Sequence, residues 1–339
     1  MNETRSGNKK RAILVACFLA SFLIGSFLIF SVPSSIKTTY GLSATTSDGE
    51  TISFNIMEPK DGGNKKKAVL IGHGVMVNKE MLKGYAIELA AAGYVAVPFD
   101  FRGHGQSTGA LETNELINDV RAVKQYLKEQ RTDIDINNLG YIGYSMGGFP
   151  GNLIVKNDSS FKCFIGIGTS LEIKKDEVDP ERTLNILMIL AKFDQAFPLK
   201  ELKKQFGAYI GEEPEDVVLN RLYGSFQEGN AAKIFYDDNS DHLSTAWDQD
   251  FIREARDWVK NTFRDVQPVD PDFYVNLRFG ILILQLIGGL GVFFLLLEPL
   301  SNLLVKSEEK QDLGLDVEET TLKELVKDLA IYSVVWFLV

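Results

Sequence analysis

The chain has 339 residues, which is long enough for about two domains. Hydrophobic residues make up 45% and charged residues 24% of it, a composition that excludes a disordered chain and a collagen-like repeat. Because 36 Lys and Arg face 46 Asp and Glu, the net charge is −10, and the chain lacks the basic surface that general nucleic-acid binding needs. Its two cysteines, Cys17 and Cys163, can form at most one disulfide.

The first apolar run is long enough to cross a membrane. Residues 12–36 are 25 residues without a charge, whereas a spanning helix needs about 20. Four basic residues precede this run: Arg5, Lys9, Lys10 and Arg11. The positive-inside rule therefore predicts a cytoplasmic N-terminus over 1–11, a transmembrane helix over 12–32 and an exported domain after it. A cleaved signal peptide is the alternative, although its apolar stretch is usually only about 7–15 residues long.

A second charge-free run covers residues 279–297 and is 19 residues long. This length predicts another transmembrane helix, with a buried helix of a soluble fold as the alternative. Its glycines suit close packing against a second membrane helix: Gly288, Gly289 and Gly291. A charged connecting segment follows over 298–328, and residues 329–339 are apolar again. We expect 329–339 to be the start of a third transmembrane helix in a chain that continues; a short end packed on the protein is the alternative.

Between these runs, residues 37–278 alternate between strand and helix patterns. A half-exposed strand is predicted over 51–57, where apolar and polar residues alternate. Six short apolar runs are typical of strands buried on both faces: 68–71, 94–99, 139–144, 161–167, 186–190 and 233–236. Three amphipathic patterns predict helices: 82–93, 118–130 and 251–263. This alternation predicts a mostly parallel sheet covered by helices, with ligands bound beyond the carboxyl ends of its strands.

A candidate nucleophile follows the strand predicted over 139–144. Ser145 lies between Gly143 and Gly147 in a Gly-x-Ser-x-Gly motif that joins this strand to a helix. On such a turn the glycines prevent clashes around a strained backbone, and the serine lies at the positive end of the helix dipole. Because a serine hydroxyl is a poor nucleophile until a base takes its proton, the motif calls for a histidine nearby.

The chain has three histidines, and they differ in their place along it. His73 and His104 each follow a predicted strand and precede the serine. His242 follows both the serine and the last predicted strand, so it is the candidate base.

The candidate acid is Asp194, in the loop after the strand predicted over 186–190. An acid in that loop can orient an imidazole and stabilise its charged form. Three other acids are rivals by sequence, although they are more typical of solvated turns: Asp237, Asp238 and Asp241.

Taken in chain order, these motifs resemble the serine hydrolases of the α/β-hydrolase superfamily, over about residues 50–265. The run Arg102-Gly103-His104-Gly105-Gln106-Ser107 resembles the monoacylglycerol-lipase and serine-aminopeptidase-like branch in particular. Members of the superfamily carry nucleophile, acid and histidine in that order, which matches Ser145, Asp194 and His242. The backbone N–H groups of Val75 and Met146 are then the expected oxyanion hole, and His73 and His104 are expected to be structural.

The expected fold is therefore an α/β-hydrolase fold, a mostly parallel sheet with helices on both faces, together with transmembrane helices. The expected function is that of a membrane-anchored serine hydrolase, with its domain on the extracytoplasmic side. It would cleave acyl esters, including lipid-derived ones, through an acyl-serine intermediate. Its partners would be a small-molecule or lipid acyl substrate and the bilayer, and the resemblance implies neither a metal nor an organic cofactor. The alternatives are a peptidase that cleaves amides and a non-catalytic binding domain with a hydrolase fold.

Two features depart from the pattern of the branch. Pro150 follows the nucleophile closely, where it is expected to cost a helix hydrogen bond. The stretch between 168 and 186 is too short for a helical lid. Residues 199–231 are left as a modest cap over the site.

Overall fold

The computed structural model describes residues 2–29, 31–60, 63, 65–179 and 181–304. It divides into two compact units, of which one comprises residues 29–281 and the other comprises the residues before and after them. The larger unit holds the whole sheet and all the candidate site residues. Its bounds lie slightly outside the 37–278 expected from the sequence.

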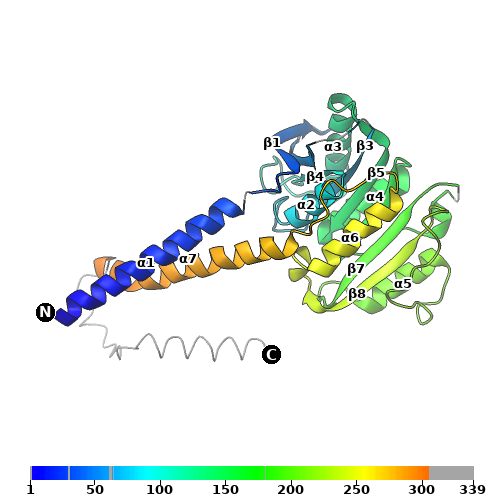
Figure 1. Cartoon of the computed structure of the whole chain (residues 1–339). Helices are drawn as coiled ribbons and strands as arrows, with labels where there is room; N and C mark the ends of the chain where they lie inside the picture. Colours follow the sequence, from blue (N-terminus) through cyan, green and yellow to red (C-terminus); the bar gives the residue numbers. More distant parts are fainter. Residues whose placement is uncertain (1, 30, 61–62, 64, 180, 305–339) are drawn as a thin grey trace. The chain divides into compact units, whose positions relative to one another are not determined.

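An eight-stranded sheet forms the centre of the larger unit, in the order β1-β2-β4-β3-β5-β6-β7-β8 (Figure 1). The strands are β1 (Ile36–Thr45), β2 (Thr51–Pro59), β3 (Lys66–Gly72), β4 (Val95–Phe99), β5 (Ile134–Tyr144), β6 (Phe161–Ile167), β7 (Asn185–Phe193) and β8 (Ala232–Asp241). The pairs β1–β2 and β2–β4 are antiparallel, and every pair from β4 to β8 is parallel. The sheet is thus mostly parallel, as the sequence predicted. Strand β1 was not predicted, because its residues are half exposed at the sheet edge and lack a continuous apolar run.

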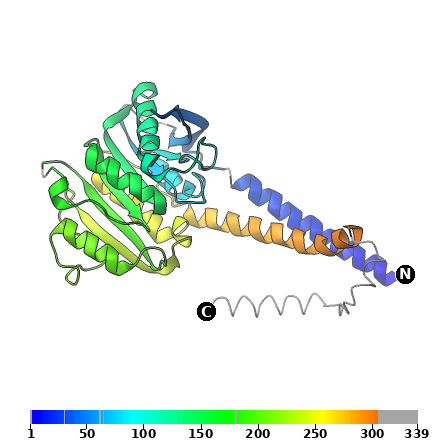
Figure 2. The same ribbon diagram turned by 180° about the vertical axis from the view of Figure 1, so that it is seen from behind.

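Helices cover both faces of the sheet, as Figures 1 and 2 show from opposite sides. On one face α2 (Lys83–Ala91) and α6 (Gln249–Thr262) contribute to one buried cluster of apolar side chains. On the other, α3 (Leu116–Gln130), α4 (Gly148–Asn157) and α5 (Leu199–Ile210) contribute to a second. Four short 3-10 helices complete the unit: η1 (Thr113–Glu115), η2 (Ser145–Gly147), η3 (Lys175–Glu177) and η4 (Ser244–Ala246).

The segment 199–231 does not form the modest cap that was expected. It begins with α5, whose Leu202 and Phe206 are buried in the same apolar cluster as α3 and α4. Burial against the sheet removes this apolar stripe from water, which a position over a solvated site would not do, so α5 is a core helix.

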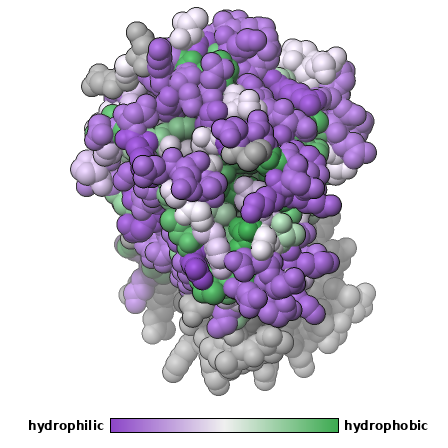
Figure 3. All heavy atoms as spheres, turned by 90° about the vertical axis from the view of Figure 1, so that its right-hand side faces the viewer, coloured by the Kyte–Doolittle hydropathy of each residue, from purple (hydrophilic) through white to green (hydrophobic). Residues whose placement is uncertain are grey.

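The surface on the right-hand side of Figure 1 is mostly hydrophilic, with hydrophobic residues gathered near its centre (Figure 3).

The second unit contains α1 (Asn2–Leu28) and most of α7 (Val275–Leu304). Within these helices, Lys9–Leu28 and Leu277–Leu297 are long and apolar enough to cross a membrane, although a signal sequence satisfies the same criteria. Helix α1 begins in the segment expected as a separate N-terminus and ends at Leu28 rather than at residue 32. Helix α7 continues past 297 into the expected connecting segment, whose remainder lies outside the described residues together with 329–339.

Candidate active site

Ser145 lies on a sharp turn directly after β5. Its φ of +50° is a conformation that residues with a side chain rarely adopt. A Cβ on Gly143 would lie 2.5 Å from the carbonyl oxygen of Gly147, and one on Gly147 would lie 2.5 Å from the carbonyl oxygen of Gly72. Both positions of the Gly-x-Ser-x-Gly motif therefore need glycine because the backbones approach so closely. Helix α4 begins three residues after the serine.

Three side chains predicted to act together are joined by hydrogen bonds. His242 Nε2 lies 3.0 Å from Ser145 Oγ, and His242 Nδ1 lies 2.8 Å from Asp194 Oδ2. An ionised carboxylate can only accept, so Nδ1 carries the ring proton and Nε2 is left to accept from the serine hydroxyl. The loops after β5, β7 and β8 supply these residues, and in a parallel sheet such loops meet at one edge.

Asp194 is held rigidly in its place. Its side chain is fully buried, and its Oδ1 accepts from the backbone N–H groups of Ala196 at 2.9 Å and Phe197 at 3.0 Å. Both carboxylate oxygens are therefore paired, which offsets the cost of burying the charge. The rival acid Asp241 instead accepts hydrogen bonds from Ser244, at the start of η4.

The ring of His242 is packed as well as hydrogen-bonded. Tyr144 stacks on it with ring centroids 5.3 Å apart, and the Tyr144 hydroxyl donates to the His242 carbonyl at 2.7 Å. Thr245 donates to the same carbonyl at 2.8 Å, and Phe197 lies at 5.7 Å between ring centroids. The imidazole keeps one orientation while about a quarter of its side chain remains exposed.

Gly168 is a site residue that the sequence did not reveal. It follows β6 with a φ of +51°, and a Cβ there would lie 2.9 Å from both Asp194 Oδ2 and His242 Nδ1. Any side chain would thus intrude on the Asp194–His242 hydrogen bond. A glycine directly after a buried strand was the only signal available, and many loops contain one.

The expected oxyanion-hole segment runs beside the serine. A Cβ on Gly74 would lie 3.2 Å from Ser145 Cβ, and Val75 follows directly. Met146, the other expected donor, is the buried residue after the serine. Gly74 and Met146 thus both lie next to Ser145, and Val75 follows Gly74 in the chain.

His73 is buried beneath this segment and lies apart from the Asp194–His242 pair. Its Nδ1 lies 2.6 Å from the Gly74 carbonyl oxygen, and its Nε2 accepts from the Phe101 N–H at 3.0 Å. Burial lowers the pKa of His73 from 6.5 to about 4, so the ring is neutral near pH 7. His104 lies beside it, with its Nδ1 at 3.0 Å from the Arg102 carbonyl oxygen. Both histidines have the structural surroundings that were expected for them.

Two buried ion pairs hold the loop that follows β4. Asp100 is fully buried and accepts from the Lys79 ammonium at 2.5 Å. The Arg102 guanidinium lies 2.7 Å from Asp119 on α3. Each pair joins residues that are far apart in the chain, so local sequence patterns could not predict it.

The expected penalty at Pro150 is not found. Helix α4 begins at Gly148, which makes Pro150 its third residue. The first four N–H groups of a helix have no partner within it, so proline loses no intrahelical bond there.

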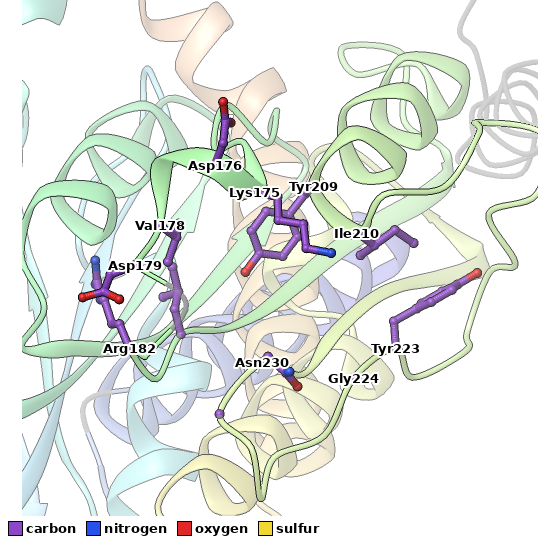
Figure 4. A pocket seen from close by; sticks show the side chains of 12 residues that line it. Lys175, Asp176, Val178, Asp179, Arg182, Tyr209, Ile210, Tyr223, Gly224 and Asn230 are labelled. Atoms are coloured by element: carbon purple, nitrogen blue, oxygen red, sulfur yellow. The ribbon is translucent and has the colours of Figure 1, made fainter.

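A cavity of about 630 Å³ lies at the other end of β7 and β8 (Figure 4). Its lining includes Leu184, directly before β7, and Asn230, two residues before β8. Asp194 and His242 come after these same strands, so the cavity and the candidate site lie at opposite edges of the sheet. Figure 4 shows Tyr209 and Lys175 extending into this cavity. Among the described residues, no group of three His, Cys, Asp or Glu could hold a metal ion.

Part of the chain matches the model of a hydrolase family. Residues 63–218 match the family model described as serine aminopeptidase, S33. An uncharacterised protein of Mycobacterium tuberculosis H37Rv is 32% identical over 89 residues, which are 26% of this chain and 31% of that protein. An uncharacterised 31.7 kDa protein of Escherichia coli is 26% identical over 127 residues, which are 35% of this chain and 42% of that protein. The chain thus matches less than half the length of either relative.

Solved structures share the fold. An esterase of Pyrococcus furiosus superposes with a TM-score of 0.52 at 16% identity, covering 68% of this chain and 96% of the esterase. A cold-adapted esterase from an Arctic intertidal metagenomic library gives a TM-score of 0.50 at 18% identity, covering 68% of this chain and 96% of that one. At such low identity the likeness concerns the fold, and that fold is the α/β-hydrolase fold.

Proposed function

Because residues 63–218 match a serine-hydrolase family model and the chain has the α/β-hydrolase fold, we propose that it is a serine hydrolase that cleaves acyl esters at Ser145. The observation that carries the proposal is the continuous hydrogen-bonded chain from Ser145 through His242 to Asp194. A binding domain has no need of a strained serine turn, a paired imidazole and a buried acid at one point. The family match supports hydrolysis in general, and the ester is our choice of substrate.

The proposed reaction uses these groups in sequence. As Ser145 Oγ attacks the acyl carbon, His242 takes the hydroxyl proton of Ser145. His242 later gives that proton to the leaving alcohol. Water then attacks the acyl-serine, with His242 again as the base, and releases the acid. Asp194 orients and stabilises the imidazolium, and its buried carboxylate accepts three hydrogen bonds.

The oxyanion of each tetrahedral intermediate would be bound by two backbone N–H groups, those of Val75 and Met146. The Val75 N–H belongs to the peptide whose carbonyl, on Gly74, lies against His73. A peptide fixed in this way needs no rearrangement when charge develops on the substrate, which is the basis of oxyanion stabilisation.

Exposed apolar side chains support an acyl ester rather than a peptide as the substrate. They occur next to proposed site residues in the chain: Met76 after Val75, Phe193 before Asp194 and Leu243 after His242. Each is more than half exposed, and Met76 is 91% exposed. Exposed apolar surface of this kind suits a hydrocarbon chain. The esterase activity named for the two structural relatives agrees with this choice, whereas the family description keeps a peptidase as the second candidate.

We further propose that α1 and α7 anchor this hydrolase in a membrane, with the domain outside the cytoplasm. The two membrane-length helices and the basic residues before the first support this topology. An anchor at each end of the domain would keep the site near lipid-derived esters.

The test is the activity of the full chain on p-nitrophenyl esters of graded acyl length beside aminoacyl anilides. We expect ester cleavage, with kcat reduced about 10⁴-fold in His242→Ala while KM changes little. Cleavage of the anilides alone would support the peptidase. Full activity of His242→Ala would contradict the assignment of the base.

A further inference from the structure

Helices α1 and α7 lie side by side and run in opposite directions (Figures 1 and 2). Their contacts ascend one helix as they descend the other: Gly25 with Gln285, Phe22 with Gly288, and Phe18 with Gly291. A Cβ on Gly288 would lie 2.5 Å from the backbone N of Phe22. The two backbones therefore approach as closely as glycine permits, the type of packing by which membrane helices associate.

A polar contact lies within this apolar interface. Gln285 is the only strongly polar side chain in the run 279–297, and its Nε2 donates to Ser26 Oγ at 3.0 Å. An amide without a partner is unfavourable in hydrocarbon, so Gln285 favours the position of α7 that faces Ser26.

A second polar contact supplies a hydrogen-bond donor that α7 itself lacks. Pro299 lies inside this helix and has no N–H to donate to the carbonyl of Leu295, four residues earlier. Arg11 on α1 donates to that same carbonyl oxygen, from Nε at 3.0 Å and from Nη2 at 2.6 Å. A carbonyl without a donor is strongly unfavourable in a bilayer, and here the neighbouring helix supplies the donor.

The two partners also suit the same membrane depth. Arg11 is near the start of the candidate span Lys9–Leu28, and Leu295 is near the end of Leu277–Leu297. In an antiparallel pair these positions lie at the same membrane surface. A guanidinium there keeps contact with water and headgroups while it bonds to the carbonyl.

We propose that the N-terminal segment is retained as the first helix of a two-helix membrane hairpin, in which Arg11 caps the carbonyl that Pro299 leaves without a donor. The inference rests on the membrane spans of the proposed function. It excludes a cleaved signal peptide, because removal of α1 would leave both Gln285 and the Leu295 carbonyl without these partners. It also requires the chain before α1 and the chain after α7 to lie on the same side of the membrane.

Cross-linking of the full chain in membrane vesicles tests the hairpin. The variant carries Ser26→Cys and Gln285→Cys, at two side chains in contact, and Cys17→Ser to remove the other thiol of α1. Equilibration in glutathione buffers, followed by alkylation of free thiols and intact mass measurement, gives the effective concentration of the pair. We expect an intramolecular disulfide in a chain that still contains residues 2–28. A membrane-bound chain without the disulfide, or one that begins after α1, would overturn the proposal.

The cap is tested in the same cross-linking background with two further substitutions. Arg11→Gln should lower the effective concentration roughly threefold, a typical size for one interhelical hydrogen bond in a membrane. In a Pro299→Ala background the same Arg11→Gln substitution should have little effect, because α7 then supplies its own backbone N–H to the Leu295 carbonyl. Arg11→Gln removes the same charge in both backgrounds, so a loss that occurs only when Pro299 is present separates the hydrogen bond from charge. An equal loss with and without Pro299→Ala would overturn the cap.

Ester hydrolysis is measured on the same vesicles. Loss of cross-linking with normal hydrolysis overturns the hairpin alone, whereas a chain found only in the soluble fraction overturns the membrane anchor as well.

Discussion

At the scale of single residues, the site depends on contacts that leave no room for change. The Asp194–His242 hydrogen bond is bounded by Gly168, where a Cβ would lie within 2.9 Å of both partners. Ser145 itself is held with a φ of +50°. Such strain persists only where the surrounding structure enforces it, and here the neighbouring glycines and Tyr141, which donates to the Gly147 carbonyl at 2.9 Å, do so.

We predict that Gly168→Ala lowers kcat by at least about 10²-fold, because the methyl group would displace His242 from Asp194. The matched control is Gly41→Ala, which adds a methyl group at a similar positive φ of +71° but with nothing within 4 Å. Ester hydrolysis and thermal unfolding of both variants check this. Equal activities of the two variants at equal stability would show that the Asp194–His242 hydrogen bond does not require glycine at position 168.

His73 predicts how stability responds to acid. Its pKa is about 4 in the folded chain and near 6.5 when unfolded, so only the unfolded chain binds the proton between these values. Its stabilisation is therefore fully present above about pH 6.5 and is lost as the pH falls towards 4, by roughly 3 kcal/mol. We expect His73→Asn to lose less stability than the natural chain between pH 7 and pH 4.5. Parallel pH profiles of the unfolding free energy would contradict this account.

At the scale of elements, the strands were predictable where burial on both faces demanded continuous apolar runs. The run 161–167 matches β6 residue for residue, whereas the edge strand β1 and the core helix α5 were missed. The apolar pattern of α5 is interrupted by four charged residues, so it did not predict a helix: Lys200, Glu201, Lys203 and Lys204. The order of serine, acid and histidine was also predictable, since each follows a strand. Gly168 and the Lys79–Asp100 pair were not, because only tertiary contacts define them.

Helix α2 carries a buried acid with the opposite pH response. Glu88 accepts from the Tyr274 N–H at 2.6 Å, and burial raises its pKa from 4.5 to about 7. The folded chain thus holds a proton that the unfolded chain has lost between these values. Its stabilisation is present below about pH 4.5 and is lost as the pH rises through 7. Between pH 5 and pH 8, the unfolding free energy of Glu88→Gln should therefore fall less than that of the natural chain. Thermal unfolding of both proteins at the two pH values measures this. A variant that is less stable at pH 8 would mean that the ion pair with Arg256, at 3.6 Å, outweighs burial.

At the scale of the whole molecule, a domain with the α/β-hydrolase fold is joined to two helices of membrane length. The proposed topology rests on the basic residues before α1, and it predicts opposite accessibility for two tags. A tag at residue 2 should be protected from an impermeant reagent in intact cells, and a tag within 37–45 should react. Protection of both tags would place the domain in the cytoplasm and contradict the charge argument.

Ser145 is the proposed nucleophile, activated by His242 and Asp194. Labelling of the full chain with a fluorophosphonate probe, followed by mass-spectrometric mapping of the modified residue, tests it most directly. We expect a single phosphonylated serine, Ser145, with no labelling of Ser145→Ala and strongly slowed labelling of His242→Ala. A folded natural chain that is not labelled, or one that is labelled at another serine, would contradict it.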